Sequence, residues 1–245
     1  MVTIRGFVWG LRNLIVNYRY FENWYVLILT PSIGKLRTYG LKFEFPTITD
    51  LAYDSYVLRE NFFENQYDFL NVKNKTVLDL GENMGDTAIL FAYKGAKKVI
   101  GYEPYTYQYQ KALKNIKLNK MENKIISIRA AASDKKGRIT IKDGYSDGSS
   151  KLINVKKGIT IPQTTLNDIV KKYKPSILKC DVEGSEYKIF PAATKKTLRS
   201  FEQMIIDYHH KGPDGLIEIL KKAGFNIEVY KYGEDDSGMI RARRL

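Results

Sequence analysis

The residues best placed to do chemistry lie in a glycine-containing turn, residues 79–87, directly after an apolar run that predicts a buried strand. Gly81 and Gly85 permit a tight turn and a close approach of backbone to ligand. Neither the full glycine pattern of a dinucleotide site nor a P-loop lysine is present, so a phosphate-binding turn is not expected. The carboxylates of the turn are Asp79, Glu82 and Asp86. They suit a ligand with positive charge, such as an ammonium or a sulfonium, unless the segment is an ordinary strand-to-helix turn.

The second predicted strand, 99–102, is followed by Glu103. This glutamate lies 22 residues beyond Gly81, about the distance at which an acid reaches ribose hydroxyls in nucleoside-binding α/β folds. The plainer alternative is a surface glutamate at a strand end. Turn and acid together account for the sulfonium, amino-acid and adenosine parts of S-adenosylmethionine (SAM), which we therefore expect as the cofactor.

Four segments, in this order, resemble the signature of FkbM-family methyltransferases: VLDLGENMGDT (77–87), VIGYEP (99–104), NIKLN (115–119) and LKCDVEGSE (178–186). The resemblance covers roughly residues 75 to 210. It implies a class I methyltransferase fold, SAM as methyl donor and usually O-methylation, often of a sugar hydroxyl. Glu82 departs from the pattern, because the family usually has alanine there, and its contacts are left open.

The resemblance also implies which residues contact the cofactor. The methionine moiety would lie against the turn residues Asp79, Gly81, Glu82, Asn83 and Gly85, of which Glu82 is the uncertain one. Glu103 would bind the ribose, and the residues beside the adenine would be Ala132, Ser133 and Asp134.

An acidic cluster of Asp181, Glu183 and Glu186 follows the fourth predicted strand, 177–182. Three carboxylates repel one another unless positive charge lies among them, and Lys179, the sulfonium or a metal are the candidates. For Glu186 we favour a plainer role, stabilisation of the next helix at its N-terminus. A divalent cation suits such an oxygen-rich cluster, but no motif demands one and we assign no metal ligand.

His209 follows the fifth predicted strand, 204–208, in an acid-x-histidine pattern that is similar to the family's, with Asp207 in place of glutamate. Histidine has a reference pKa of about 6.5, so a neutral imidazole is available at physiological pH to take a proton from an alcohol. We expect His209 as base and Asp181 as positioning group, with Glu183 beside them and the roles exchangeable. A structural, hydrogen-bonded histidine is the competing interpretation.

The pattern of apolar residues predicts the elements that position these groups. We expect strands at 76–80, 99–102, 125–131, 177–182, 204–208, 227–230 and 239–242, separated by helices near 84–92, 109–116, 166–173 and 216–223. An inserted hairpin or loop is expected over 139–161. This order predicts an α/β fold with a doubly wound, mostly parallel seven-stranded sheet and an antiparallel final strand. Ligands of such sheets bind beyond the carboxyl ends of the strands, where the strand order reverses.

The chain changes character near residues 71–75, which predicts an N-terminal extension (1–70) and a methyltransferase domain (71–245). In the extension we expect a helix over 4–18, a strand over 41–45 and a helix that Asp50 caps and that runs towards Phe63. Aromatic residues beside Arg5, Arg12 and Arg19 suggest a lid, an oligomer contact or an interfacial membrane anchor. Simple packing on the second domain is an equal alternative.

Composition limits the class of protein. The chain has 245 residues, a net charge of +13 and one cysteine, so a disulfide framework and a cysteine-rich zinc site are excluded. Its longest apolar run, 24–29, is far shorter than the roughly 20 residues of a membrane-spanning helix, and no signal-peptide pattern is found. We expect a cytoplasmic protein, with peripheral membrane contact as an option and an unknown oligomeric state.

The sequence thus favours a SAM-dependent methyltransferase that O-methylates a sugar hydroxyl in a glycan, glycolipid or glycoside. The charge of +13 motivates an RNA methyltransferase as the alternative. Nucleic acid is disfavoured as a partner, because the lysines are dispersed and no Asp-Pro-Pro-Tyr or Pro-Cys motif occurs. A binding module that kept the fold and lost the chemistry is the non-enzymatic alternative.

Overall fold

The computed structural model describes residues 20–23, 34–142, 154–231 and 236–244. The helix expected over 4–18, with Arg5, Arg12 and Arg19, lies outside these residues, as do the proposals made for it. None of the helices in the described part of the chain combines the length and the hydrophobicity that crossing a bilayer requires.

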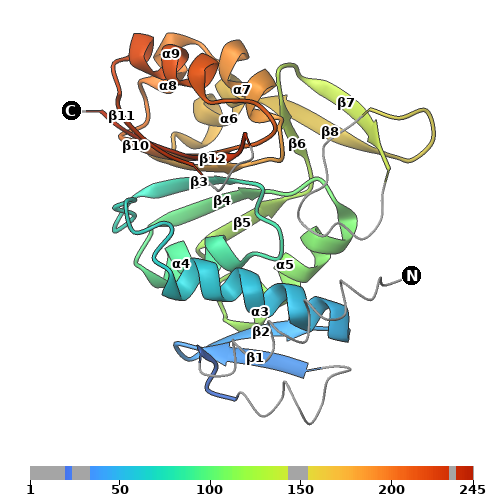
Figure 1. The fold of residues 1–245 in the computed structure, drawn as a ribbon. Coiled ribbons are helices and arrows are strands. Elements are labelled where there is room, and N and C mark those ends of the chain that lie inside the picture. The colour runs from blue at the N-terminus through green and yellow to red at the C-terminus, as the bar shows by residue number, and fades with distance from the viewer. Residues whose placement is uncertain (1–19, 24–33, 143–153, 232–235, 245) are drawn as a thin grey trace.

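A seven-stranded sheet forms the centre of the molecule (Figure 1). Its strands, in chain order, are β3 (Thr76–Leu80), β4 (Lys98–Tyr102), β5 (Ile125–Ile128), β9 (Ile177–Asp181), β10 (Gln203–Tyr208), β11 (Asn226–Lys231) and β12 (Gly238–Arg243). The spatial order is β11-β12-β10-β9-β3-β4-β5, and β12 runs antiparallel to both of its neighbours. The predicted doubly wound sheet with an antiparallel final strand is confirmed.

Helices cover both faces of this sheet (Figure 1). One face carries α3 (Ile48–Phe63), α4 (Asp86–Tyr93) and α5 (Thr106–Leu118), and the other carries α6 (Leu166–Tyr173), α7 (Glu186–Ala192), α8 (Lys195–Leu198) and α9 (Asp214–Ala223). Successive strand residues point to opposite faces. Val77 therefore packs in the core with α3 and α4, whereas Leu78 packs in the core beneath α6 to α9.

The predicted strand over 125–131 is wrong as a single element. Ala130 N–H donates to the carbonyl of Ile128 at 2.9 Å, a tight turn that ends β5 and redirects the chain. The next strand, β6 (Ala131–Ser133), joins a separate three-stranded sheet with β7 (Gly137–Ile141) and β8 (Ile159–Thr165). The antiparallel pair β7–β8 is the inserted hairpin that the sequence predicts.

The described part of the predicted N-terminal extension shares a hydrophobic core with the sheet. It contains an antiparallel hairpin, β1 (Gly34–Thr38) and β2 (Leu41–Phe45), followed by α3. The sequence predicted β2 but not β1. Thr47, not Asp50, caps α3: its side chain accepts a hydrogen bond from the backbone N–H of Asp50 at 3.1 Å. The Thr47 hydroxyl donates in turn to the carboxylate of Asp50 at 2.5 Å, and this carboxylate has further partners described below.

Asn115 of α5 and Asn119, which caps this helix at its C-terminus, attach β2 to the rest of the molecule. The side-chain oxygens of Asn115 and Asn119 accept hydrogen bonds from the backbone N–H groups of Glu44 and Lys42, both at 2.8 Å. Asn119 also donates to the carbonyl of Lys42, again at 2.8 Å. These side chains pair the edge of β2 as a further strand would, which gives the NIKLN segment a structural role.

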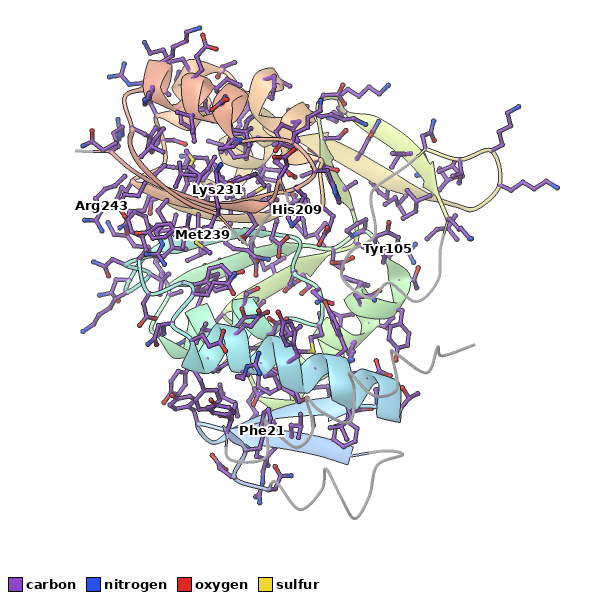
Figure 2. All side chains as sticks on the ribbon, in the orientation of Figure 1. Phe21, Tyr105, His209, Lys231, Met239 and Arg243 are labelled. Atoms are coloured by element: carbon purple, nitrogen blue, oxygen red, sulfur yellow. The ribbon has the colours of Figure 1, made fainter. Side chains whose placement is uncertain are left out.

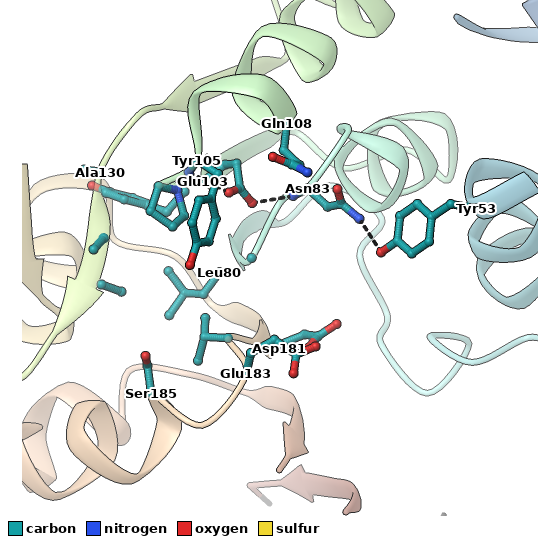
Figure 3. Close-up of a pocket in the computed structure, with 16 residues that line it drawn as sticks. Tyr53, Leu80, Asn83, Glu103, Tyr105, Gln108, Ala130, Asp181, Glu183 and Ser185 are labelled. Carbon is teal, nitrogen blue, oxygen red and sulfur yellow. Dashed lines mark hydrogen bonds between the residues drawn. The ribbon is translucent and has the colours of Figure 1, made fainter. Parts of the chain in front are cut away.

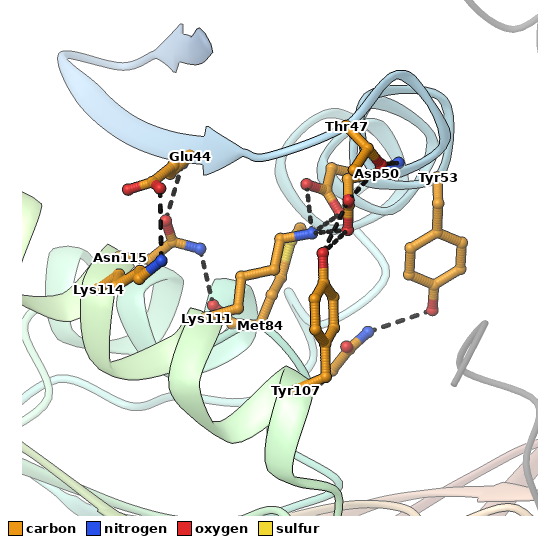
Figure 4. A network of polar contacts seen from close by, with 11 residues as sticks. Glu44, Thr47, Asp50, Tyr53, Met84, Tyr107, Lys111, Lys114 and Asn115 are labelled. Carbon is orange, nitrogen blue, oxygen red and sulfur yellow. Dashed lines mark hydrogen bonds and ion pairs between the residues drawn. The ribbon is translucent and has the colours of Figure 1, made fainter. Parts of the chain in front are cut away.

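A buried ion-pair network fixes α3 against α5 (Figure 4). Lys111 Nζ lies 2.8 Å from carboxylate oxygens of both Asp50 and Asp54, and all three side chains are at least nine-tenths buried. The Tyr107 hydroxyl donates to Asp50 as well. Burial alone would raise the pKa of Asp50, but Lys111 and the hydrogen bonds hold it below the usual range. Lys111 therefore compensates two buried carboxylates at once.

Replacement of this cation should be costly. We expect Lys111→Met to lower the free energy of unfolding by about 3–5 kcal/mol, because it leaves two buried carboxylates without their partner. Lys114→Met is the matched control on the same helix: Lys114 is 60% exposed and its ion pair with Glu44 is 3.6 Å long, so the loss should stay below about 1 kcal/mol. Urea denaturation measures both, and equal losses would contradict this account.

Candidate functional site

The site begins where β3 and β9 leave the sheet side by side, the point at which the strand order reverses. Gly81, just after β3, has a φ of +79°, and a Cβ there would lie 1.7 Å from the carbonyl oxygen of Asp181. No other residue fits this contact. Its N–H and that of Glu82 both donate to the carbonyl of Tyr102, at 3.0 and 3.1 Å. The glycine thus lets the turn after β3 pack directly against the backbone at the ends of β4 and β9.

A pocket opens over this turn (Figure 3). It is lined by small and aromatic residues and by a few polar groups: Tyr53, Leu80, Gly81, Asn83, Tyr102, Glu103, Pro104, Tyr105, Gln108, Ala130, Ala131, Ala132, Asp181, Val182, Glu183 and Ser185. The alanines and the tyrosine and proline rings offer flat apolar surface. Of the three acids in this lining, Asp181 and Glu183 lie at the end of β9, and Glu103 follows β4. We call this the upper pocket.

Glu103 is the polar group held most firmly in the upper pocket. One carboxylate oxygen accepts the backbone N–H of Asn83 at 3.0 Å, and the other accepts that of Tyr105 at 2.9 Å. Each oxygen keeps a second lone pair for a ligand hydroxyl. Burial raises the pKa of Glu103 to about 7, although both backbone hydrogen bonds lower it. A hydroxyl-bearing ligand would favour the ionised form.

Tyr53 brings the N-terminal part of the chain into the site. Its hydroxyl accepts a hydrogen bond from the side-chain amide of Asn83 at 3.1 Å (Figure 3). Asn83 itself has a φ of +50°, a conformation that asparagine tolerates better than most residues. Sequence reasoning missed Tyr53, since only the docking of α3 brings it to the pocket.

The other predicted cofactor residues lie in different surroundings. Asp79 is fully buried, 3.2 Å from Lys179 Nζ, and accepts the Thr87 hydroxyl at 2.6 Å. Gly85, with a φ of +82°, lets α4 approach α5: a Cβ there would lie 3.2 Å from the Cα of Ala112. Neither residue lines the upper pocket; both support the turn from behind.

Glu82 points away from the pocket into the protein. Its carboxyl group accepts the Ser127 hydroxyl at 2.6 Å and fills the space in which a side chain at Gly101 would stand. Burial raises its pKa to about 8 despite the hydrogen bond from Ser127. This explains how the turn accommodates an acid at a position where the family usually has alanine.

Of the three residues expected beside the adenine, Ala132 lines the upper pocket. Ser133 and Asp134 do not line it, and their side chains hydrogen-bond to each other at 2.9 Å. The small residues Ala130 and Ala131, which precede β6 and begin it, line the pocket instead.

The three predicted catalytic residues do come together. His209 Nε2 lies 3.7 Å from Asp181 and 3.8 Å from Glu183. Its backbone N–H donates to the buried Glu186 at 2.8 Å, and Glu186 also accepts the N–H of Gly184. One ligand atom from each of His209, Asp181 and Glu183 falls within 4.8 Å of the others, a spacing that a divalent cation would fit.

The charge state of His209 differs from the expectation of a neutral imidazole. Burial lowers its pKa, but the hydrogen bond with Glu186 and the charges of Asp181 and Glu183 raise it to about 9. At neutral pH the imidazole is therefore protonated in this structure. Any role as a base requires that a ligand or a higher pH remove this proton.

A second pocket adjoins the upper one and shares Tyr53, Gly81, Asn83, Asp181 and Glu183 with it. It extends under α3 to the last two strands. Its further lining residues are Tyr56, Val57, Glu60, Asn61, Glu64, Gln66, Tyr67, Asp86, Thr87, Lys179, Asp207, His209, Tyr230, Met239 and Arg241. We call this the lower pocket. The acids and His209 lie where the two pockets meet.

This arrangement agrees with what comparison with known proteins finds. A family model described as the methyltransferase FkbM domain matches residues 79–227. The chain belongs to the FkbM methyltransferase family. The match includes the turn, Glu103 and the acidic cluster, so the resemblance noted in the sequence is confirmed.

Individual relatives are distant. The "Hexuronic acid methyltransferase AglP" of Haloferax volcanii is 24% identical over 229 residues, which is 89% of this chain and 91% of that protein. The crystal structure of methyltransferase FkbM from Methylobacillus flagellatus KT is 14% identical with a TM-score of 0.55, covering 97% of this chain. The present chain spans only 60% of that protein's length.

A putative rRNA methylase from Clostridium thermocellum is 10% identical with a TM-score of 0.50, covering 74% of this chain and 93% of that one. At these identities the two solved structures show the class I methyltransferase fold alone.

The buried carboxyl group of Glu82 should make the stability of the protein depend on pH. An ordinary glutamate has a pKa of about 4.5, and burial raises that of Glu82 to about 8, so between these pH values the folded protein holds a proton that the unfolded chain has lost. The contribution of Glu82 to stability is therefore fully present below pH 4.5 and is lost as the pH rises to about 8. We expect Glu82→Gln to gain stability relative to the parent as pH rises, by about 3 kcal/mol at pH 7, with the gain levelling off only above about pH 8.

Urea titrations between pH 5 and 8 measure this difference, with the exposed Glu122→Gln as control. A difference between Glu82→Gln and the parent that stays constant with pH would show that Glu82 is ionised in the folded protein.

Proposed function

We propose that this FkbM-family protein is a SAM-dependent O-methyltransferase whose acceptor is a hydroxyl group of a sugar in a glycan, glycolipid or glycoside. The observation that carries the proposal is the buried Glu103 carboxylate, held by two backbone N–H groups in a pocket whose other end is acidic. The likeness to a protein named as a hexuronic acid methyltransferase supports a sugar acceptor.

The upper pocket fits SAM by the chemistry of its lining. Glu103 has two lone pairs for the ribose hydroxyls, and the alanines before and within β6 leave room for the adenine beside Tyr102 and Pro104. Asp181 and Glu183 supply negative charge for the sulfonium and amino-acid end. Bound SAM would supply an electrophilic methyl group, and the protein's part is to position the acceptor oxygen and remove its proton.

His209 is the proposed base and Asp181 the proposed positioning group, with Glu183 beside them. All three line the lower pocket next to the cofactor region. Since the imidazole is protonated at neutral pH, the sulfonium's positive charge would favour loss of this proton. The neutral imidazole could then accept the proton of a sugar hydroxyl.

The cofactor proposal predicts tight binding of the demethylated product, S-adenosylhomocysteine, together with a rise in melting temperature. Glu103→Gln should weaken binding about 10- to 100-fold, because it removes a charged acceptor of hydroxyl hydrogen bonds. Isothermal titration calorimetry measures the change, and Glu122→Gln should bind as the parent does. If neither SAM nor its product shifts the melting temperature at millimolar concentration, the proposal fails.

The base proposal predicts that His209→Asn and Asp181→Asn each lower turnover about 100-fold or more, with product affinity nearly unchanged in His209→Asn and only modestly weaker in Asp181→Asn, because Asp181 also lines the upper pocket. The adjacent His210→Asn, whose ring centroid lies 6.0 Å from that of His209, is the matched control and should keep normal turnover. Turnover should rise with pH and level off below about 9, because the sulfonium charge lowers the pKa of the imidazole from the value of about 9 that it has without the cofactor.

The assay follows labelled methyl transfer from SAM to fractionated glycans, lipids, RNA and protein. Label that enters RNA would favour the alternative acceptor class. Activity that disappears with a chelator and returns with Mg²⁺ would assign His209, Asp181 and Glu183 to a cation, whereas normal turnover of folded His209→Asn would make this histidine structural.

A further inference from the structure

The lower pocket extends well beyond the residues that the proposed reaction uses. From the acidic cluster it runs along α3 to the last two strands of the sheet, β11 and β12. A ligand that fills the lower pocket therefore reaches its junction with the upper pocket. On the proposed function, which this inference rests on, the lower pocket is the acceptor site.

Arg241 stands at the β12 end of this pocket. On β12, Gly238 pairs with Tyr208, next to His209, and Arg241 lies three residues further along the strand. Met239 and Arg243 mark the direction of this strand away from His209 in Figure 2. Arg241 shares a strand face with Met239, and both line the pocket.

The guanidinium group of Arg241 has no acidic partner among the residues that the structure describes. Within the described ranges, no carboxylate lies at ion-pairing distance from it, and Nε is buried without a hydrogen-bond partner. Even Glu228, its register partner on β11, forms no ion pair with it. A buried guanidinium donor without an acceptor costs free energy that a bound anion would recover.

Two aromatic rings hold this group in place. The guanidinium carbon lies 4.5 Å from the ring centroid of Tyr230 and 5.9 Å from that of Phe69. Contact with ring faces uses none of the N–H donors of the planar group. The edge that carries these donors matches a carboxylate, which it can bind through two parallel hydrogen bonds.

The other cations of the lower pocket are already occupied. Lys179 pairs with Asp79 and donates to the carbonyl of Gly81 at 2.6 Å. His209 lies among Asp181, Glu183 and Glu186. Among the described lining residues, Arg241 is the cation that remains for a ligand.

The remaining lining suits a sugar. Tyr56, Tyr67 and Tyr230 contribute aromatic surface, and Glu60 and Glu64 contribute acceptors for ring hydroxyls. The same carboxylates disfavour a dianionic phosphate more strongly than a singly charged carboxylate, because repulsion scales with ligand charge.

We propose that Arg241 binds the carboxylate of an acidic sugar, so that the acceptor is a uronic acid residue rather than a neutral hexose. Arg241 then determines specificity by anchoring the ring in the lower pocket, while the acidic cluster at the other end acts on a hydroxyl.

The test compares two sugars that differ only at C6. With the protein saturated with S-adenosylhomocysteine, NMR titration measures the Kd of methyl β-glucuronoside and of methyl β-glucoside. The glucuronoside should bind about 10- to 100-fold more tightly, as expected for charge-assisted hydrogen bonds. Arg241→Met should abolish this ratio by weakening the glucuronoside alone, and Arg241→Lys should keep only part of it.

Arg243→Met is the matched control, because Arg243 stacks on Phe69 at 4.8 Å two residues along the same strand but does not line the pocket. It should keep the full ratio. The 6-phosphate of methyl β-glucoside serves as a third probe and should bind less tightly than the glucuronoside.

Calorimetry of S-adenosylhomocysteine binding to each variant distinguishes failure of the proposed function from failure of the acidic-sugar inference. Failure of the parent to bind it refutes the proposed function. If the parent binds S-adenosylhomocysteine normally, four results refute the acidic-sugar inference alone. These are equal affinity for the two sugars, no binding of either sugar, tightest binding of the phosphate, and a glucuronoside preference that survives in folded Arg241→Met.

Discussion

A single buried cation, Lys179, allows an acidic site to exist at the junction of β3 and β9. Its ammonium group lies 3.2 Å from Asp79 and donates to the carbonyl of Gly81 at 2.6 Å. Burial lowers the pKa of Lys179, but the surrounding carboxylates, Asp79, Asp181 and Asp86 foremost, raise it above its ordinary value. The lysine is therefore charged. It compensates the acids of the turn and ties the turn to β9, where Gly81 contacts the backbone of Asp181 without space for a Cβ.

The two pockets depend on this junction and on a second buried lysine. Lys111 compensates Asp50 and Asp54 and so fixes α3, which carries Tyr53 into the upper pocket and Tyr56 and Glu60 into the lower one. The described part of the N-terminal region thus forms a wall of the site. Loss of a lysine that compensates two buried carboxylates strongly destabilises a fold. The shape of both pockets therefore depends on a few buried charges.

The local part of this site was predictable from sequence. The turn with Gly81 and Gly85, Glu103 after the next strand and the acids after β9 are short-range patterns, and parallel strands bring their carboxyl ends together whatever the details of packing. The cluster of Asp181, Glu183 and His209 follows from the same rule. The seven-stranded sheet was predictable because its strands are short segments rich in apolar residues that alternate with helical patterns, although β11 (NIEVYK) and β12 (GMIRAR) also contain charged residues.

What the sequence could not give depends on contacts between distant segments. Glu82 looks like a ligand residue in the sequence, yet the absence of a side chain at Gly101 lets it turn inward to Ser127. Tyr53 and Arg241 carry no local motif, and only the docking of α3 and the register of β12 bring them to the pockets. The histidine's pKa likewise depends on three carboxylates from elsewhere in the chain and on burial.

The central claim is that the upper pocket holds SAM with its methyl group directed at the lower pocket. A crystal structure of the protein with S-adenosylhomocysteine tests it most directly. The account predicts that both ribose hydroxyls hydrogen-bond to Glu103, that the adenine lies beside Ala130 to Ala132, and that the sulfur lies near Asp181 and faces His209. A ribose bound away from Glu103, or a sulfur that faces away from the lower pocket, would contradict it.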